Sequence, residues 1–93
     1  MQVIWSPTAL AQLIEIHRYI QQDKPDAARR VAARIVASVA ALVEHPHLGH
    51  PGPKAGIREL GVARTPYVIS YRAEEERLIL LTILHGAQRK TTQ

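Results

Sequence analysis

The stretch that decides the fold is HPHLGHPGPKAGIREL at residues 45–60, continued by GVARTPYVISYR at residues 61–72. Its first part interleaves three prolines with three glycines, so a long regular helix is excluded and a loop is predicted. Apolar residues then return in residues 57–62 and 67–72, which we predict to be strands separated by a turn at Thr65-Pro66. The chain therefore changes here from helix to sheet.

Two amphipathic helices are predicted before this loop. Ser6 and Pro7 form a helix start, because serine caps free amide groups and proline suits the first helical position. The first helix should extend to about Gln22 and the second from Pro25 to about Glu44. We expect the buried face of the first to contain Leu10, Leu13, Ile14, His17 and Ile20 or Gln21, broadened by Ile16 and Tyr19. We expect the second to bury Ala28, Val31, Ala32, Ile35, Val39, Leu42 and Val43. Its many alanines should let the two helices approach closely as an antiparallel hairpin.

Strands are predicted at both ends of the chain. Residues 2–6 alternate as a short strand, and residues 78–85 form an apolar run typical of a central strand covered on both faces. The element order is thus β-α-α-β-β-β. We predict a single α+β domain over residues 1–93, with the N-terminal helical hairpin packed on one curved, mainly antiparallel sheet.

The composition narrows the function classes. Lys and Arg total 12 against 8 Asp and Glu, giving a formal net charge of +4, so polyanions and acidic proteins are both compatible partners. The absence of cysteine excludes disulfides, thiolate nucleophiles and zinc–thiolate sites. The first residues lack the pattern of a signal peptide, and no apolar run reaches the roughly 20 residues needed to span a membrane. A cytoplasmic protein with no membrane partner is expected.

Several short motifs, taken in their order, resemble the ParE/RelE superfamily of bacterial type II toxins. They are Val3-Ile4-Trp5-Ser6-Pro7, the proline- and glycine-rich loop, Arg58-Glu59-Leu60, the strand from Pro66 to Arg72, and Leu84-His85. The resemblance covers nearly all of the chain. It implies the fold of that superfamily, a cognate antitoxin that forms a hetero-oligomer with the chain, and no cofactor.

The middle strand is closer to the ParE branch. RelE-like ribosome-dependent ribonucleases typically carry an arginine where this chain has Val68, within Tyr67-Val68-Ile69-Ser70-Tyr71. ParE-like toxins are understood to inhibit DNA gyrase without catalysis, and this is the leading hypothesis. Two alternatives stay open. One is a metal-independent endonuclease of ribosome-bound mRNA, with Arg58 and His85 as candidate catalytic residues. The other is an inactive homologue that acts in promoter regulation with its antitoxin.

An inhibitor needs a binding surface, and arginine and aromatic side chains most often supply interface energy. The candidates for contact with antitoxin or target are Arg29, Arg34, Arg58, Tyr67, Tyr71, Arg72 and His85. Tyr67 and Tyr71 share one strand face and Arg72 points the other way. Each has a structural alternative: a tyrosine could be a core residue, Arg58 could tie the loop to the sheet, and His85 could be structural.

Three histidines, His45, His47 and His50, form an H-x-H-x-x-H pattern that could offer three imidazoles to a metal ion. Metal ligands are usually held by regular structure and by further partners, whereas these lie among prolines and glycines. We therefore predict no metal site and interpret them as loop histidines that add positive charge below neutral pH.

Overall fold

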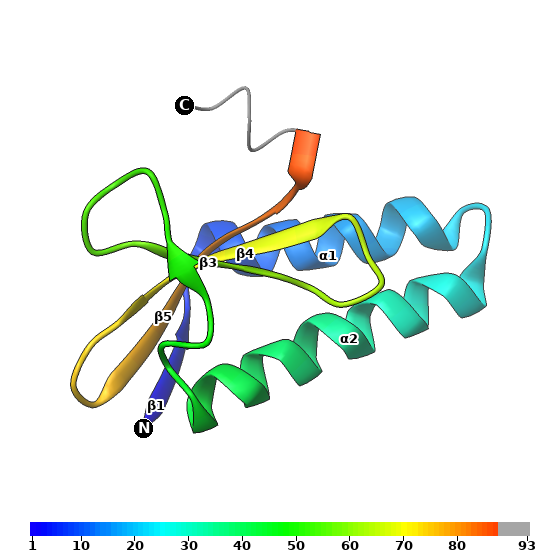
Figure 1. The fold of residues 1–93 in the computed structure, drawn as a ribbon. Helices are drawn as coiled ribbons and strands as arrows, with labels where there is room; N and C mark the ends of the chain where they lie inside the picture. The colour runs from blue at the N-terminus through cyan, green and yellow to red at the C-terminus, as the bar shows by residue number, and fades with distance from the viewer. Residues whose placement is uncertain (88–93) are drawn as a thin grey trace.

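The computed structural model describes residues 1–87 and folds them as two helices and a five-stranded sheet (Figure 1). The elements are β1 (Gln2–Trp5), α1 (Pro7–Gln21), α2 (Pro25–Glu44), β2 (His50–Pro51), β3 (Arg58–Gly61), β4 (Tyr67–Ala73) and β5 (Arg77–His85). Every predicted helix and strand is present, with each boundary within one residue of the prediction. The short strand β2 was not predicted; it forms inside the proline- and glycine-rich loop.

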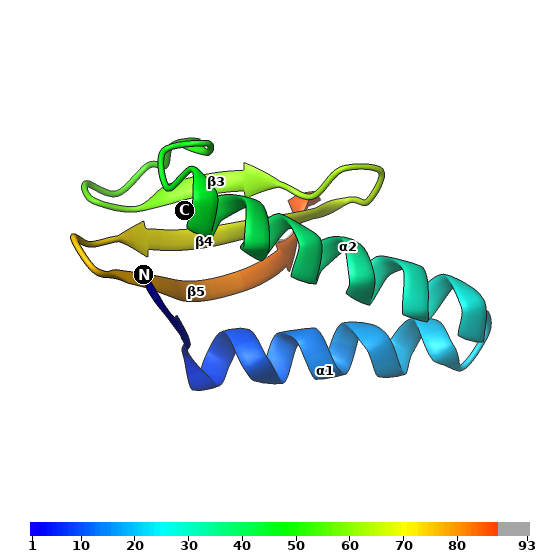
Figure 2. The same cartoon turned by 90° about the horizontal axis from the view of Figure 1, so that it is seen from below.

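The sheet has the strand order β1-β5-β4-β3-β2, and both helices lie on one of its faces (Figure 2). Strand β1 pairs with β5 in parallel, whereas all other neighbours are antiparallel. The helical hairpin is the connection that lets the chain leave β1 and return to the sheet. The predicted α+β class, with a hairpin of helices on a mainly antiparallel sheet, is confirmed. Within residues 1–87, no helix is long and apolar enough to cross a membrane.

The start of α1 follows the sequence signal closely. Ser6 has an extended backbone with φ −62° and ψ 154°, and its Oγ accepts a hydrogen bond 3.0 Å long from the Ala9 N–H. The same hydroxyl donates to the Leu81 carbonyl at 3.0 Å. Ser6 therefore both caps the helix and fastens its first turn to β5.

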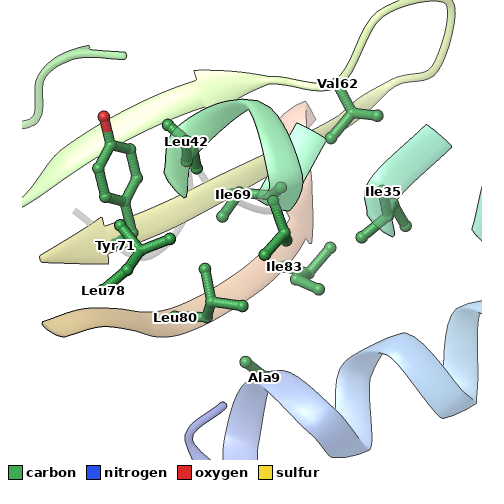
Figure 3. Close-up of a cluster of buried hydrophobic side chains, with 10 residues drawn as sticks. Ala9, Ile35, Leu42, Val62, Ile69, Tyr71, Leu78, Leu80 and Ile83 are labelled. Atoms are coloured by element: carbon green, nitrogen blue, oxygen red, sulfur yellow. The ribbon is translucent and has the colours of Figure 1, made fainter. Parts of the chain in front are cut away.

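The core lies between the helical hairpin and strands β4 and β5 (Figure 3). Ile35, Val39 and Leu42 come from α2, as predicted, and Ala9 comes from α1. The strands contribute the fully or nearly fully buried Ile69, Tyr71, Leu78, Leu80 and Ile83. These side chains are the ones that the apolar runs of the sequence supply on the face toward the helices.

Strand β5 changes its buried register at a β-bulge. Tyr71 pairs with Leu80 but the preceding Ser70 pairs with Thr82, so Leu81 is skipped in the ladder. Burial consequently shifts from even to odd positions, from Leu80 to Ile83. The strand is interior to the sheet, as predicted. The prediction that both of its faces are covered is wrong, because both helices pack on the same face.

The predicted face of α1 is also wrong in part. Leu10, Ile14 and Tyr19 are 47%, 59% and 72% exposed, and Ala9, which was not predicted, is fully buried. Leu13 and Ile16 pack against the core, as predicted. Residues at three- and four-residue spacing from Ala9 form an equally regular stripe. That stripe faces the sheet because Ser6 ties the first turn to β5 and leaves room only for a small side chain at position 9.

Candidate functional site

Tyr71 holds the loop that follows α2. Its side chain is fully buried, and its hydroxyl donates to the Pro46 carbonyl at 2.8 Å and accepts from the Gly49 N–H at 3.0 Å. The ring packs in the core while the hydroxyl satisfies two backbone groups of the loop. Of the two interpretations given for this tyrosine, the structure supports a core residue. The side chain is fully buried and has no surface that a partner could contact.

Arg58 fastens the same loop. Its Nη2 donates to the Gly49 carbonyl at 2.5 Å and to the His47 carbonyl at 3.2 Å. Its Nε–H is buried without an acceptor in the described part of the chain. The guanidinium therefore binds backbone of the protein itself, as in the loop-tying alternative. A role for Arg58 toward a partner would act through the loop that it positions.

Tyr67 and His85 meet at the other end of β4. The two residues are opposite each other in the ladder, and their rings form an edge-to-face contact with centroids 5.8 Å apart and an interplanar angle of 81°. His85 is exposed, and its Nδ1 accepts a hydrogen bond 3.1 Å long from the Ala87 N–H. Burial, and to a smaller extent the nearby Tyr19, raises the pKa of Tyr67. A raised pKa keeps this phenol protonated at neutral pH, so it is a poor general base there.

Val68 lies beside Gly61 of β3 and Leu84 of β5 on the sheet. By alternation along β4 it is on the face opposite the buried Ile69, away from the helices. Val68 is half-buried. The position at which a cation would hold a scissile phosphate in the ribonuclease hypothesis is thus occupied by an apolar side chain with an apolar neighbour.

Arg29 and Arg72 are exposed and lie apart. Arg29 forms an ion pair with Asp26 in the first turn of α2, and both side chains are largely in solvent. Such a pair contributes little to stability. Arg72 is exposed on β4 between the buried Tyr71 and the half-buried Ala73, so it points away from the tyrosines as predicted. Both arginine side chains are accessible from the solvent, Arg29 within its ion pair.

Arg34 lies at a groove between α2 and the β3–β4 turn. The groove has a volume of about 290 Å³ and is lined by Arg34, Ala37, Ser38, Ala41, Ala63 and Arg64. Arg34 Nη1 donates to the Arg64 carbonyl at 3.2 Å. Sequence analysis missed Arg64. Its backbone has φ 61°, a left-handed conformation that glycine or asparagine usually adopts. An arginine at this position therefore gave no sequence signal for a left-handed turn.

The histidines of the loop do not converge. His45, His47 and His50 are exposed, and the His50 Nδ1 lies 3.1 Å from the Pro51 carbonyl. No group of three or more His, Cys, Asp or Glu side chains in residues 1–87 is arranged to hold a metal ion.

The predicted site residues therefore fall into separate places. Arg58 of β3 and Tyr71 of β4 pair beside the loop after α2, Tyr67 of β4 and His85 of β5 pair at the opposite end of β4, and Arg34 is at the groove beside the β3–β4 turn. This arrangement offers basic and aromatic surfaces rather than one convergent set of reacting groups. It suits binding to another macromolecule better than bond cleavage.

Comparisons with known proteins identify the family of this chain. A family model described as "ParE toxin of type II toxin-antitoxin system, parDE" matches residues 3–90. The chain is 45% identical over 87 residues to "Putative toxin Y4kP" of Sinorhizobium fredii, covering 94% of this chain and 90% of the relative. It is 39% identical over 87 residues to "Toxin RelE2" of Caulobacter vibrioides, covering 94% and 97%.

Solved structures agree on the fold. The chromosomal ParDE toxin–antitoxin system from P. aeruginosa superposes with a TM-score of 0.81 at 26% identity, covering 91% of this chain and 95% of that one. The YoeB dimer from Staphylococcus aureus has a TM-score of 0.61 at 12% identity, covering 88% and 92%, and supports the fold alone.

A basic α+β chain that matches a toxin family model and has relatives named as toxins is a small protein toxin of the type II toxin–antitoxin class. More specifically, the chain belongs to the ParE toxin family. Such a toxin has a cognate antitoxin as its partner. This family assignment confirms the resemblance found in the sequence.

Proposed function

We propose that this toxin arrests growth by binding and inhibiting DNA gyrase in the cytoplasm, and that its antitoxin neutralises it in a hetero-oligomer. The observation that carries the proposal is Val68. The toxin acts as an inhibitor because the strand position that would hold an arginine in a RelE-like ribonuclease is apolar, beside Gly61 and Leu84. Inhibition by binding requires neither proton transfer nor a cation that holds a scissile phosphate.

The basic and aromatic groups at the surface are the proposed contact residues. Arg29 and Arg72 are exposed, Arg34 is half-buried, and half-buried Tyr67 forms an aromatic pair with exposed His85 beside the β3–β4 turn. Arg58 and Tyr71 serve these contacts indirectly, because they hold the loop after α2 in place. Arginine and tyrosine side chains of this kind carry much of the energy of protein interfaces.

A second candidate is a metal-independent endonuclease of ribosome-bound mRNA. The observation that favours it is the contact between His85 and Tyr67, which brings two groups capable of proton transfer to one strand end. Arg58 would be the remaining cation, although its guanidinium already binds two loop carbonyls. A third candidate, an inactive homologue with a purely regulatory role, would show neither activity.

Two assays separate these candidates. The purified full chain is tested for inhibition of gyrase supercoiling and, in a translating extract, for cleavage of mRNA. We expect inhibited supercoiling with intact mRNA. His85→Gln serves as the diagnostic variant, since loss of a general acid or base lowers a rate by about 10² to 10⁴. Codon-positioned cleavage that disappears in well-folded His85→Gln would replace the gyrase proposal with the ribonuclease.

A further inference from the structure

The outer side of the helical hairpin, away from the sheet, carries large apolar side chains in contact with solvent. Leu10 is 47% exposed, Ile14 is 59% exposed and Val36 is 53% exposed. The solvent face of a helix in a globular protein usually carries charged and polar side chains instead. The core of this protein does not explain these three residues, because the buried residues of α1 and α2 are on the other side of each helix.

These three side chains lie side by side. Val36 is on the side of α2 toward α1, because Arg34, on the opposite side of α2, lines the groove beside the β3–β4 turn. Leu10 is on the side of α1 toward α2, because Gln12, on the opposite side of α1, binds the edge of β5. Leu10 precedes the end of α1 by as many residues as Val36 follows the start of α2, so the two are at one level of the hairpin. Ile14 is one helical turn from Leu10. A contiguous apolar patch of this kind marks a contact surface.

On α2 the patch continues into a regular line of exposed positions. They follow the alternating three- and four-residue spacing of a coiled-coil seam and are Arg30, Ala33, Ala37, Ala40 and Glu44. Val36 is one helical turn from both Ala33 and Ala40, so the line and the patch form one surface. Alanine at the three central positions lets a second helix approach closely. The line ends in a cation on one side and an anion on the other.

The charges at the two ends of this line are complementary to a second copy of the chain. Arg30 lies two helical turns before Ala37, and Glu44 lies two turns after it on the same face of α2. If a second α2 packs antiparallel across Ala37, Arg30 of each copy meets Glu44 of the other. Neither side chain takes part in the ion pairs found within residues 1–87. A parallel arrangement would instead set like charges against each other at both ends.

We propose that the outer face of the hairpin is the interface of a symmetric homodimer, in which α2 packs antiparallel on its copy across Ala37 with an Arg30–Glu44 ion pair at each end. A two-fold axis places the α1 helices of the two copies on the same side of the α2 pair. Leu10 and Ile14 of one copy therefore face those of the other and are covered as well. The four helices form a layer between the two sheets. This inference is independent of the target of the toxin.

Sedimentation equilibrium of the purified full chain, without antitoxin, measures the dimer. We expect a monomer–dimer equilibrium in which Arg30→Glu and Glu44→Arg each weaken association by about tenfold or more. The double variant Arg30→Glu/Glu44→Arg exchanges the two signs and should dimerise as the wild type does. Ala37→Glu places two like charges at the axis and should give a monomer. Lys54→Glu, at an exposed position of the loop before β3, is the control for the change in charge and should leave the dimer unchanged.

A chemical cross-link locates the interface independently. The chain has no cysteine, so a short bifunctional maleimide can join Ala37→Cys only to the same position of a second copy. We expect cross-linked dimers of Ala37→Cys and none of Lys54→Cys. A wild-type chain that is monomeric at every concentration, or a dimer that persists in Arg30→Glu, Glu44→Arg and Ala37→Glu, would overturn the inference. Weaker binding of Ala37→Glu to the antitoxin or to gyrase, with a monomeric wild type, would assign this face to that partner instead.

Discussion

The side-chain carbonyl oxygen of Gln12 on α1 accepts a hydrogen bond 2.7 Å long from the backbone N–H of Ile83 on β5. Strand β1 pairs with β5 only as far as Leu80, so the edge of β5 beyond that point has lost its strand partner. Ser6, which caps α1, and Gln12 of α1 bind that edge instead: the hydroxyl of Ser6 donates to the Leu81 carbonyl, and the side-chain oxygen of Gln12 accepts from the Ile83 N–H. The helix thereby closes an edge that would otherwise leave unpaired backbone groups next to the core.

Replacing Gln12 with leucine should destabilise the protein by about 1 to 3 kcal/mol, because the Ile83 N–H is left without an acceptor. Gln12→Glu keeps an oxygen acceptor of nearly the same shape and should lose less. Urea unfolding of the two variants and the wild type measures the difference. Equal stability of Gln12→Leu and wild type would mean that this contact does not contribute to the fold.

Tyr71→Phe should cost about 1 to 3 kcal/mol although it removes one oxygen atom. The ring stays in the core, but the Gly49 N–H loses its acceptor and the Pro46 carbonyl loses its donor. Thermal unfolding gives the loss of stability, and hydrogen exchange at Gly49 should become faster. Protection of that amide at the wild-type level would contradict the proposed role of the hydroxyl.

Gly49→Ala should be more damaging, at about 3 kcal/mol or more. The added Cβ would lie 2.5 Å from the Glu59 carbonyl oxygen and 2.8 Å from the Tyr71 hydroxyl, and the first of these is backbone that cannot rotate away. Gly61→Ala is the matched control, since nothing lies within 4 Å of its added Cβ. A melting temperature that falls equally in both variants would show that the close approach at Gly49 is not the cause.

The boundaries of helices and strands were readable from the sequence because local signals fix them. Pro7 and Pro25 begin the helices, and the prolines and glycines of residues 46–56 end the second one. These signals act within a few residues and need no knowledge of the fold. The sequence also placed Val68 correctly in the middle strand of the sheet, which is β4.

What the sequence did not reveal depends on contacts between distant residues. The rotation of α1 is set by Ser6 bonding to Leu81, 75 residues away, and the bulge in β5 appears only when that strand is aligned with β4. Arg58 and Tyr71 are equally plausible as surface or loop-holding residues until the loop is placed over them. Arg64 was missed because it lines a groove that forms only when α2 and the β3–β4 turn come together.

The orientation of α1 predicts unequal effects of substitutions at neighbouring positions. Leu10→Ala should change stability by less than about 0.5 kcal/mol, because the side chain is 47% exposed. Ala9→Leu should cost about 1 to 3 kcal/mol, because a fully buried methyl group leaves no space for a larger side chain. Denaturant unfolding of both variants decides between the two faces of the helix. A large loss in Leu10→Ala with none in Ala9→Leu would restore the face expected from the sequence.

Tyr67 should make the protein less stable in alkaline solution. Burial first and Tyr19 second raise the pKa of Tyr67 above its ordinary value of 10.0, so the unfolded chain loses this proton more readily than the folded one. The stability linked to this group is therefore fully present below pH 10 and is lost as the pH rises through the folded pKa. The phenols are titrated by absorbance in the wild type and in Tyr67→Phe. The variant should lack a phenol that ionises at a higher pH than an ordinary tyrosine. Tyr19→Phe should lower the pKa of Tyr67 only part of the way back to its ordinary value, since the larger cause, burial, is unchanged. A Tyr67 phenol that ionises together with free tyrosine would contradict both the burial of this side chain and its proximity to Tyr19.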